Sequence, residues 1–309
     1  QLAKGVENLF VEVHLKDAEG HTVTAQIKDH HNNVTLLQKD DTVLVSAKQD
    51  SSANTKKGDR SLLTIKGILE FADEVRMEDV KELLDRQIQM NSAISQEGLK
   101  NPYGAEVGRV LLQHGNDLRT RARAAAAAGS DARMGGCALP VVINSGSGNQ
   151  GITTSVPVIV YARELGVSDE KLLRALTLSN LTTIHEKTPI GRLSAYCGAI
   201  SAGAGAGAGI AYLCGGGYEA VIHTVVNALA IVSGVICDGA KASCAAKIAT
   251  AVEAGLLGYN MYIRGQQFRG GDGIVAKGVE NSLRNVGRLG KQGMKETNRE
   301  IIDIMVGCK

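Results

Sequence analysis

The first 66 residues alternate apolar and polar side chains with the period of a β-strand. The alternation is clearest over residues 9–15 and 21–27 and resumes at 34–37. Turn-forming residues interrupt it at 17–20 and 31–33. A polar stretch at 51–59 is typical of a linker. We therefore expect a small β-rich lobe over residues 1–66.

Beyond residue 66 the apolar positions recur at steps of three and four, which is the period of an α-helix. Residues 80–94 carry one such face, and the run 104–128 ends at Gly129, which is a plausible helix C-cap. Ser168 and the two acids after it predict the start of another helix. The expected fold class is α+β, with a large, mostly α-helical domain over residues 67–309.

Two long uncharged runs, Cys197–Cys214 and Val221–Cys237, raise the question of a membrane protein. Gly and Ala at small-xxx-small spacing would suit helix packing in a bilayer. Both runs are at or below the roughly 20 residues that span the hydrocarbon core. Neither is flanked by aromatic belts or by the expected Lys/Arg asymmetry. We predict instead a Gly/Ala helix buried at the centre of a helical bundle, and no membrane partner.

The composition is that of an ordinary globular protein, with 44% hydrophobic and 21% charged residues among 309. A formal net charge of +2 without a long basic run argues against a nucleic-acid partner. Six cysteines in this length do not resemble a disulfide scaffold, and the first residues show no signal-peptide pattern. We expect a cytoplasmic protein with reduced thiols. Because the chain begins at Gln1 rather than at methionine, we also expect a fragment or a processed product.

Three of the cysteines, Cys197, Cys237 and Cys244, lie in segments built mainly of small and aliphatic residues. The last two flank a turn-like pair, Asp238-Gly239, which can bring both sulfurs to one point. Three thiolates in a region with few charges suit a soft metal or an iron–sulfur cluster with one coordination position left open. The alternative is three buried free thiols, because unpaired cysteine is among the most buried residue types.

A glycine-rich loop at residues 146–151 matches the pattern G-x-G-x-x-G and follows an apolar run at 139–143. No second strand with an acidic end follows it, so a dinucleotide site is not expected. Its neutral donors and the backbone amides ahead of a helix that begins near Gly151 predict a site for a substrate carboxylate. A structural turn whose polar groups satisfy one another is the alternative.

Several motifs together resemble one family. They are Ser-Asp-Ala-Arg-Met-Gly-Gly at 130–136, Asn-Ser-Gly-Ser-Gly-Asn-Gln-Gly at 144–151, the segment 191–197 that leads to Cys197, the segment 236–244 and Gly-Ile-Val-Ala at 273–276. The chain resembles the L-cysteine desulfidase family, the YhaM-like or UPF0597 proteins, over nearly its whole length. That family is related to the α-domain of iron–sulfur L-serine dehydratases.

The resemblance implies an oxygen-sensitive lyase with a [4Fe–4S] cluster that converts L-cysteine to pyruvate, ammonia and hydrogen sulfide. It implies Cys197, Cys237 and Cys244 as the cluster ligands. The other cysteines, Cys137, Cys214 and Cys308, are then expected to be buried free thiols. L-serine dehydration at the same kind of cluster remains an alternative, as does a non-catalytic thiolate-ligated metal or redox protein.

The expected partner is a small amino-acid substrate. Arg133 is the candidate for binding its carboxylate bidentately. Other residues expected at the site are Ser147, Asn149 and Gln150 for substrate binding, and Lys187, Lys241 and His185 as candidates for the catalytic base. The base itself is not assigned.

The family also carries an upstream segment with a Gly-Cys-Thr-Glu-Pro motif, whose cysteine is thought to take part in catalysis. This chain has no such motif. We expect that the segment belongs to a separate piece of the same protein or has been lost, and that the isolated chain turns over poorly. A homo-oligomer is expected.

Overall fold

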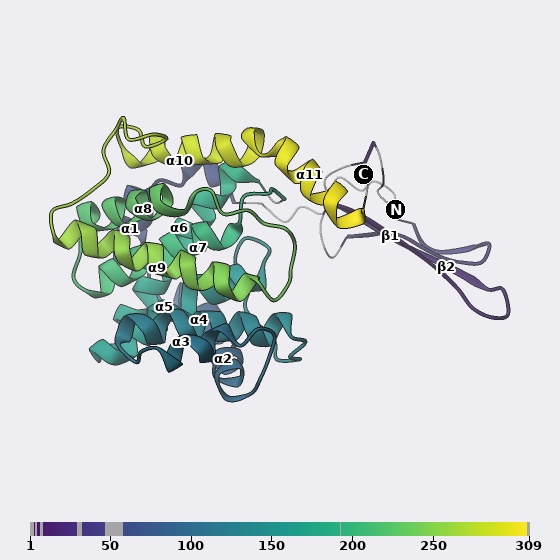
Figure 1. The fold of residues 1–309 in the computed structure, drawn as a ribbon, viewed down its shortest axis with the longest axis horizontal. Coiled ribbons are helices and arrows are strands. Elements are labelled where there is room, and N and C mark those ends of the chain that lie inside the picture. The colour runs from purple at the N-terminus through teal and green to yellow at the C-terminus, as the bar shows by residue number, and fades with distance from the viewer. Residues whose placement is uncertain are drawn as a thin grey trace. The chain divides into compact units, whose positions relative to one another are not determined.

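The computed structural model describes residues 3, 5–6, 9–29, 33–46, 58–191 and 193–307. The chain divides into two compact units, residues 1–59 with 303–309 and residues 60–302. An antiparallel sheet lies in the first unit and helices build the second (Figure 1). The predicted α+β class is therefore confirmed. Most of the predicted linker, residues 51–57, lies outside the described residues, as does Cys308.

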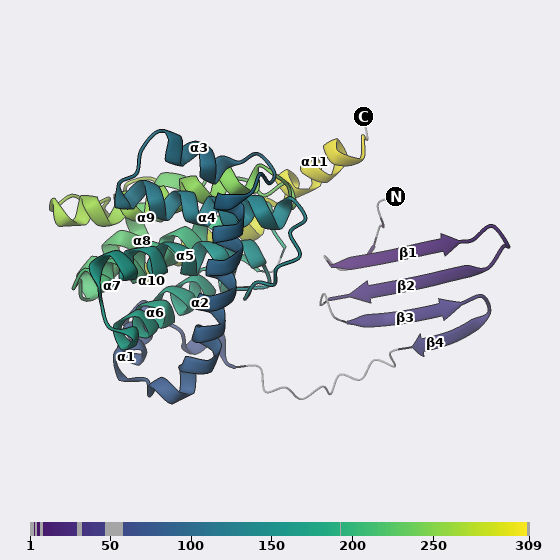
Figure 2. The same ribbon diagram turned by 90° about the horizontal axis from the view of Figure 1, so that it is seen from below.

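The sheet is a meander of four antiparallel strands in sequence order (Figure 2). Its strands are β1 (Phe10–Lys16), β2 (Thr22–Lys28), β3 (Val34–Lys39) and β4 (Thr42–Ser46). Val13 pairs with Ala25, and Ala25 pairs with Leu37, so apolar residues share one face. The three predicted strands are confirmed, whereas β4 was not predicted. No described strand residue is buried.

Eleven α-helices are described. Their bounds are α1 (Ile65–Glu74), α2 (Met77–Lys100), α3 (Val107–Gln113), α4 (Leu118–Met134), α5 (Gly148–Leu165), α6 (Asp169–Ile190), α7 (Gly198–Leu213), α8 (Tyr218–Val232), α9 (Cys244–Ile263), α10 (Val279–Arg288) and α11 (Lys295–Val306). A short 3₁₀ turn, Arg60–Leu62, precedes α1, and a π-helical turn, Leu289–Gly293, follows α10. Ser168 begins α6 as predicted, because its hydroxyl accepts a hydrogen bond from the Lys171 N–H at 3.2 Å.

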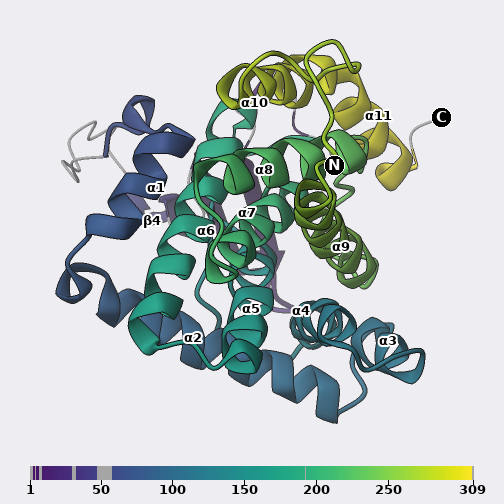
Figure 3. The ribbon, with the colours of Figure 1, turned by 90° about the vertical axis from the view of Figure 1, so that its left-hand side faces the viewer.

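Helix α7 is the centre of the second unit. It packs against α5, α6, α8 and α9, which surround it in Figure 3. Every residue from 199 to 213 is buried. The predicted Gly/Ala helix at the centre of a bundle is thus confirmed. Among the described residues, no helix is both long enough and apolar enough to cross a membrane.

Small residues let α7 and α9 approach closely. A Cβ atom on Gly203 would lie 2.3 Å from the carbonyl oxygen of Ala251, and one on Gly207 would lie 2.9 Å from the Cα of Gly255. Glycine in a helix interior costs about 1 kcal/mol relative to alanine. The close contact explains why α7 accepts that cost. In both pairs the residue of α9 comes 48 positions after its neighbour in α7, so the two helices run parallel.

One predicted helix was wrong. The run 104–128 forms two helices, α3 and α4, and Gly129 lies inside α4 rather than capping its end. A Cβ atom on Gly129 would come within 3.0 Å of an Ile152 methyl group. The glycine is therefore explained by packing of α4 against α5. Local cap rules do not contain this information.

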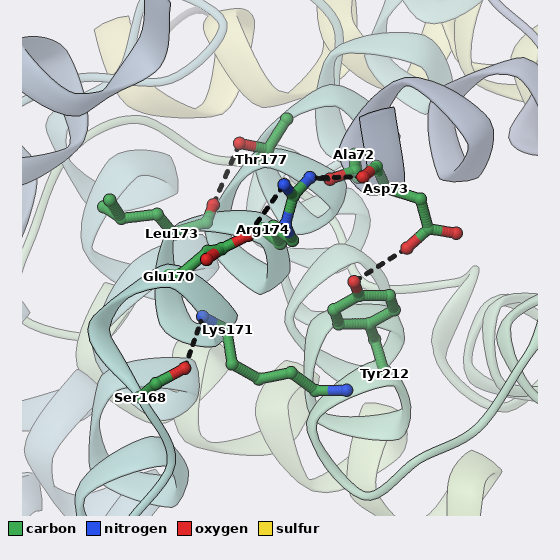
Figure 4. Close-up of polar contacts among 9 residues, drawn as sticks. All are labelled: Ala72, Asp73, Ser168, Glu170, Lys171, Leu173, Arg174, Thr177 and Tyr212. Carbon is green, nitrogen blue, oxygen red and sulfur yellow. Dashed lines mark hydrogen bonds and ion pairs between the residues drawn. The ribbon is translucent and has the colours of Figure 1, made fainter. Parts of the chain in front are cut away.

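An arginine ties the end of α1 to the start of α6 (Figure 4). The Arg174 guanidinium donates to the carbonyls of Ala72 at 2.7 Å and Asp73 at 2.5 Å, and to the Glu170 carboxylate. The Tyr212 hydroxyl donates to the Asp73 carboxylate at 2.7 Å, which adds the end of α7. Burial and this hydrogen bond raise the pKa of Tyr212 to about 12. These contacts satisfy carbonyls that a helix end leaves without partners.

We predict that Arg174→Met lowers the free energy of unfolding by about 1–3 kcal/mol, because two carbonyls at the end of α1 lose a charged donor. Arg86→Met is the matched control. Arg86 also pairs with a glutamate four residues earlier, Glu82, but both side chains are exposed. The control should change stability by less than about 0.5 kcal/mol. Urea unfolding measures both, and equal losses would contradict the interpretation.

Candidate functional site

Two of the candidate ligand cysteines lie at the starts of parallel helices. Cys197 immediately precedes α7, and Cys244 is the first residue of α9. Gly203 of α7 lies against Ala251 of α9, which is 48 residues later in the chain. The same offset places residue 245 opposite Cys197. The helices rise equally per residue, so the two cysteines begin their helices at about the same level. Helix packing therefore brings together residues 47 positions apart in the sequence.

A short antiparallel contact positions the third cysteine. Tyr196 and Ile236 form an isolated β-bridge. The Cys197 N–H donates to the Val235 carbonyl at 3.2 Å, and the Cys237 N–H donates to the Ala195 carbonyl at 2.6 Å. The Cys244 thiol in turn contacts the Gly239 carbonyl at 3.6 Å. Backbone hydrogen bonds thus connect the segments of Cys197 and Cys237, and the thiol of Cys244 is hydrogen-bonded to the segment of Cys237.

The three thiols influence one another electrostatically. Burial raises the pKa of Cys197 to about 11, and the neighbouring charges of Cys237 and Cys244 act in the same direction. The backbone N–H of Ala199 and the charge of Lys247 act in the opposite direction. Cys197 is therefore a neutral thiol at pH 7 until a metal takes the place of its proton.

The chemistry of the thiols indicates which group they could hold. In the described part of the chain, only Asp17, Glu19 and His21 place three ligand atoms within 4.8 Å of one another, and all three are exposed. The three sulfurs of the cysteine site are therefore more widely spread. Around one tetrahedral zinc ion, sulfurs would lie about 3.8 Å apart, given Zn–S bonds of about 2.3 Å. Three soft thiol donors beside two helix N-termini are the donor set that an iron–sulfur cluster with three protein ligands requires.

The glycine-rich loop leads directly to this site. Ser147 caps α5, its hydroxyl accepting from the Gln150 N–H at 3.5 Å. A Cβ atom on Gly198 would lie 2.5 Å from the Gln150 carboxamide carbon, so that side chain lies against the residue after Cys197. The Gln150 Oε1 atom is buried and has no hydrogen-bond partner among the described residues. The loop therefore places a free buried acceptor beside the thiols.

The other expected substrate residues belong to the same loop. Arg133, near the end of α4, donates to the Asn149 side-chain oxygen at 3.3 Å. Its guanidinium also lies against Gly148, where a Cβ atom would come within 2.4 Å of Nε. Arg133 is only partly buried, whereas Asn149 and Gln150 are buried. The structure thus brings Arg133, Ser147, Asn149 and Gln150 together at the start of α5, and Gln150 lies against Gly198, the residue after Cys197.

The three candidate bases have different environments. Lys187 is 6% exposed, and burial lowers its pKa although the charges of Cys237 and Cys197 oppose this. Lys241 instead pairs with Asp238 at 3.3 Å and is 39% exposed. His185 pairs with Glu280 at 2.7 Å, on the side of α6 that faces α10. Among the described residues, Lys187 is the only one of the three without an ion pair.

Two of the remaining cysteines are described. Cys214 is exposed at the end of α7, so the expectation of a buried thiol is wrong for this residue. Its position after the last helical turn explains the exposure, because the chain leaves the core there. Cys137 is half-buried in the loop between α4 and α5.

Sequence reasoning missed a buried polar group beneath the site. Glu186 is 2% exposed, and neither carboxyl oxygen has a hydrogen-bond partner among the described residues. The same holds for the hydroxyls of Thr182, Tyr196 and Ser201. Burial raises the pKa of Glu186 well above its usual value and so favours the neutral carboxylic acid. No local signal distinguishes Glu186 from the many glutamates on helix surfaces, because its burial comes from the packing of α6 and α7.

Lys247 was also missed. It lies one turn into α9, and its ammonium donates to the Ile236 carbonyl at 3.0 Å and to the Asp238 carboxylate. Its charge lies close enough to Cys197 to lower the pKa of that thiol. The spacing of three residues from Cys244 was visible in the sequence, but not the partners of its side chain.

Comparisons with known proteins show the family to which the chain belongs. The family model described as serine dehydratase alpha chain matches residues 16–303. A UPF0597 protein of Desulfitobacterium hafniense is 61% identical over 92% of this chain and 66% of its own length. UPF0597 proteins of Lachnoclostridium phytofermentans and Finegoldia magna are 49% and 45% identical, over 97% and 99% of this chain and 72% and 73% of their own lengths. No solved structure matches the chain.

The matching family model places the chain in a lyase-like class of proteins. The chain belongs to the serine dehydratase alpha chain family and is related to the UPF0597 proteins. The resemblance found in its motifs is confirmed. Since the chain spans 66–73% of the length of these relatives, the activity, substrate and partners of the whole protein are treated as proposals.

We predict that Glu186→Gln becomes progressively more stable than the native chain as the pH rises above about 4.5, the ordinary pKa of the group. The folded state retains a proton that the unfolded chain releases, so the native chain loses stability across this range. Glutamine has the same shape and no proton to lose. Urea unfolding at several pH values measures the difference. Glu82→Gln, which changes a carboxylate that is 88% exposed, is the control for the pH dependence of the rest of the chain. Parallel pH curves for Glu186→Gln and the native chain would refute the prediction.

Proposed function

We propose that this chain is the cluster-binding part of an iron–sulfur lyase that removes sulfide from L-cysteine by β-elimination. The observation that carries the proposal is the meeting of Cys197, Cys237 and Cys244 at the starts of α7 and α9. Gln150 and Lys187 lie beside them. The family description, serine dehydratase alpha chain, supports the lyase class. The products would be pyruvate, ammonia and hydrogen sulfide.

The three cysteines would hold a [4Fe–4S] cluster with one open iron. When bound, such a cluster supplies a Lewis acid that polarises a substrate group. Burial raises the pKa of Cys197 to about 11, so this thiol would carry its proton before assembly and would lose it on binding iron. The N-termini of α7 and α9 then stabilise the resulting negative charge.

The glycine-rich loop would bind the substrate carboxylate. Amides at the start of α5 point out of the helix end and favour an anion. Arg133 lies beside them and supplies a charged donor fork. Asn149 and Gln150 would orient the bound amino acid, since their side chains are buried at this helix start. This arrangement would direct the carboxylate to α5 and the thiol of the substrate to the cysteine site.

Lys187 would take the proton from the substrate Cα. A base must be neutral to accept a proton, and burial favours the neutral amine by lowering the pKa of Lys187. As the proton moves to Nζ, the Cβ–S bond breaks and its electron pair leaves with the sulfur. The aminoacrylate that remains tautomerises and is hydrolysed by water to pyruvate and ammonia. Lys241 is less suited because it is 39% exposed and pairs with Asp238, and His185 is less suited because it pairs with Glu280 on the side of α6 that faces α10.

L-serine is the second candidate substrate, because the matching family model is named for a serine dehydratase. The same residues would act, with the hydroxyl as the leaving group. A small amino acid is in either case the proposed partner, and a reducing cytoplasm is the proposed location because free thiols stay reduced there. We retain a homo-oligomer as part of the proposal.

We predict that Lys187→Met abolishes sulfide release from L-cysteine, lowering kcat by about 10²-fold or more, while the iron and sulfide content stays at the native level. The control is Lys171→Met. Lys171 lies on the first turn of α6, at the opposite end from Lys187, and its ammonium lies 4.5 Å from the centre of the Tyr212 ring. It should retain activity. Assays are anaerobic, with L-cysteine and L-serine, on the protein at the full length of its relatives.

Unchanged turnover in Lys187→Met would remove Lys187 as the base. An iron-loaded native protein that acts on neither amino acid would contradict the proposed function itself. Faster turnover of L-serine than of L-cysteine would select the second candidate substrate.

A further inference from the structure

Lys247 braces the segment that carries Cys237. Its ammonium donates to the carbonyl of Ile236 at 3.0 Å and to the carboxylate of Asp238. These two residues are the immediate neighbours of Cys237 on either side. The side chain is only 21% exposed, so the contacts are made in a partly desolvated place. One lysine therefore restrains the backbone both before and after a candidate ligand.

The same lysine belongs to the helix that carries Cys244. It follows Cys244 by three residues on α9, so the two side chains start from neighbouring positions on one helix. The bridge of Ile236 to Tyr196 continues the connection to Cys197. Lys247 thus links the three ligand segments through contacts that are independent of any bound metal.

The charge of Lys247 also acts on the thiols. Burial lowers its pKa, but the hydrogen bond that Lys247 donates to Asp238 and the charges of Asp238, Cys197 and Cys244 outweigh this and raise the pKa. A fixed positive charge beside three thiolates offsets part of their mutual repulsion. Such surroundings of a cluster also raise its reduction potential, because added electrons are stabilised.

Lys241 provides a contrast within the same loop. It pairs with the same carboxylate, that of Asp238, at 3.3 Å. It is 39% exposed, however, whereas Lys247 is 21% exposed and is among the groups that act on the pKa of Cys197. The two lysines therefore share one partner but differ in their contact with the backbone around Cys237.

We propose that Lys247 is a positioning residue of the metal site, which holds the Cys237 segment against α9 and supplies a positive charge to the bound cluster. This inference rests on the proposed iron–sulfur function and adds a residue that the family resemblance did not include. Lys247 does not bind the metal or the substrate. It acts through the cysteines that do.

The test uses the 309-residue chain reconstituted anaerobically with ferrous iron and sulfide. Lys247→Met should release iron to a chelator about 10-fold faster or more, in line with the effect of residues that orient metal ligands. Its cluster should also have a lower midpoint potential. Lys247→Arg keeps the charge and should return the potential toward the native value. Lys241→Met should match the native chain in both measurements.

The outcomes separate this inference from the proposed function. If the native chain takes up no cluster, the proposed function fails and this inference fails with it. If the native chain holds a cluster and Lys247→Met behaves as Lys241→Met does, only this inference is overturned. A lower melting temperature of the iron-free Lys247→Met chain, with unchanged iron release and potential, would assign Lys247 to folding alone and would also overturn it.

Discussion

The close approach of α7 to α9 is the constraint on which the rest of the site depends. A single added methyl group at Gly203 would come within 2.3 Å of the Ala251 carbonyl oxygen, so the helices can adopt this separation only with glycine there. Because both helices begin at a cysteine, their register also sets the relative height of Cys197 and Cys244. The β-bridge between Tyr196 and Ile236, which holds the Cys237 segment, lies at the start of α7. The contact of Gln150 with Gly198 lies there too.

The site consists of groups that are unfavourable to bury without a ligand. Burial favours the neutral forms of three groups. It raises the pKa values of the Cys197 thiol and the Glu186 carboxyl, and it lowers the pKa of the Lys187 amine. Proteins retain such groups where a function depends on them, at a cost in stability. A bound cluster would reverse the preference at Cys197, because a metal replaces its proton. Two helix N-termini and the charge of Lys247 are already in place to stabilise that change.

Much of the fold could be predicted because its signals are local. Alternation identified the first three strands, the Ser168 cap identified the start of α6, and uniform Gly/Ala content identified the buried helix α7. Gly129 was misread because its role is a contact between α4 and α5. The residues of the candidate site show the same difference between local signals and long-range packing. Motifs pointed to the cysteines and the glycine-rich loop, which remain predictions, whereas the surroundings of Glu186 and Lys247 depend on how helices far apart in the sequence pack together.

The central claim is that Cys197, Cys237 and Cys244 jointly hold a cluster, and the iron content of cysteine variants tests it most directly. Each of Cys197→Ser, Cys237→Ser and Cys244→Ser should lose most of its iron and sulfide after anaerobic reconstitution, together with the visible absorption near 400 nm. Cys214→Ser is the matched control, because Cys214 lies at the opposite end of α7 from Cys197. It should assemble a complete cluster. Full clusters in the three ligand variants would contradict the account.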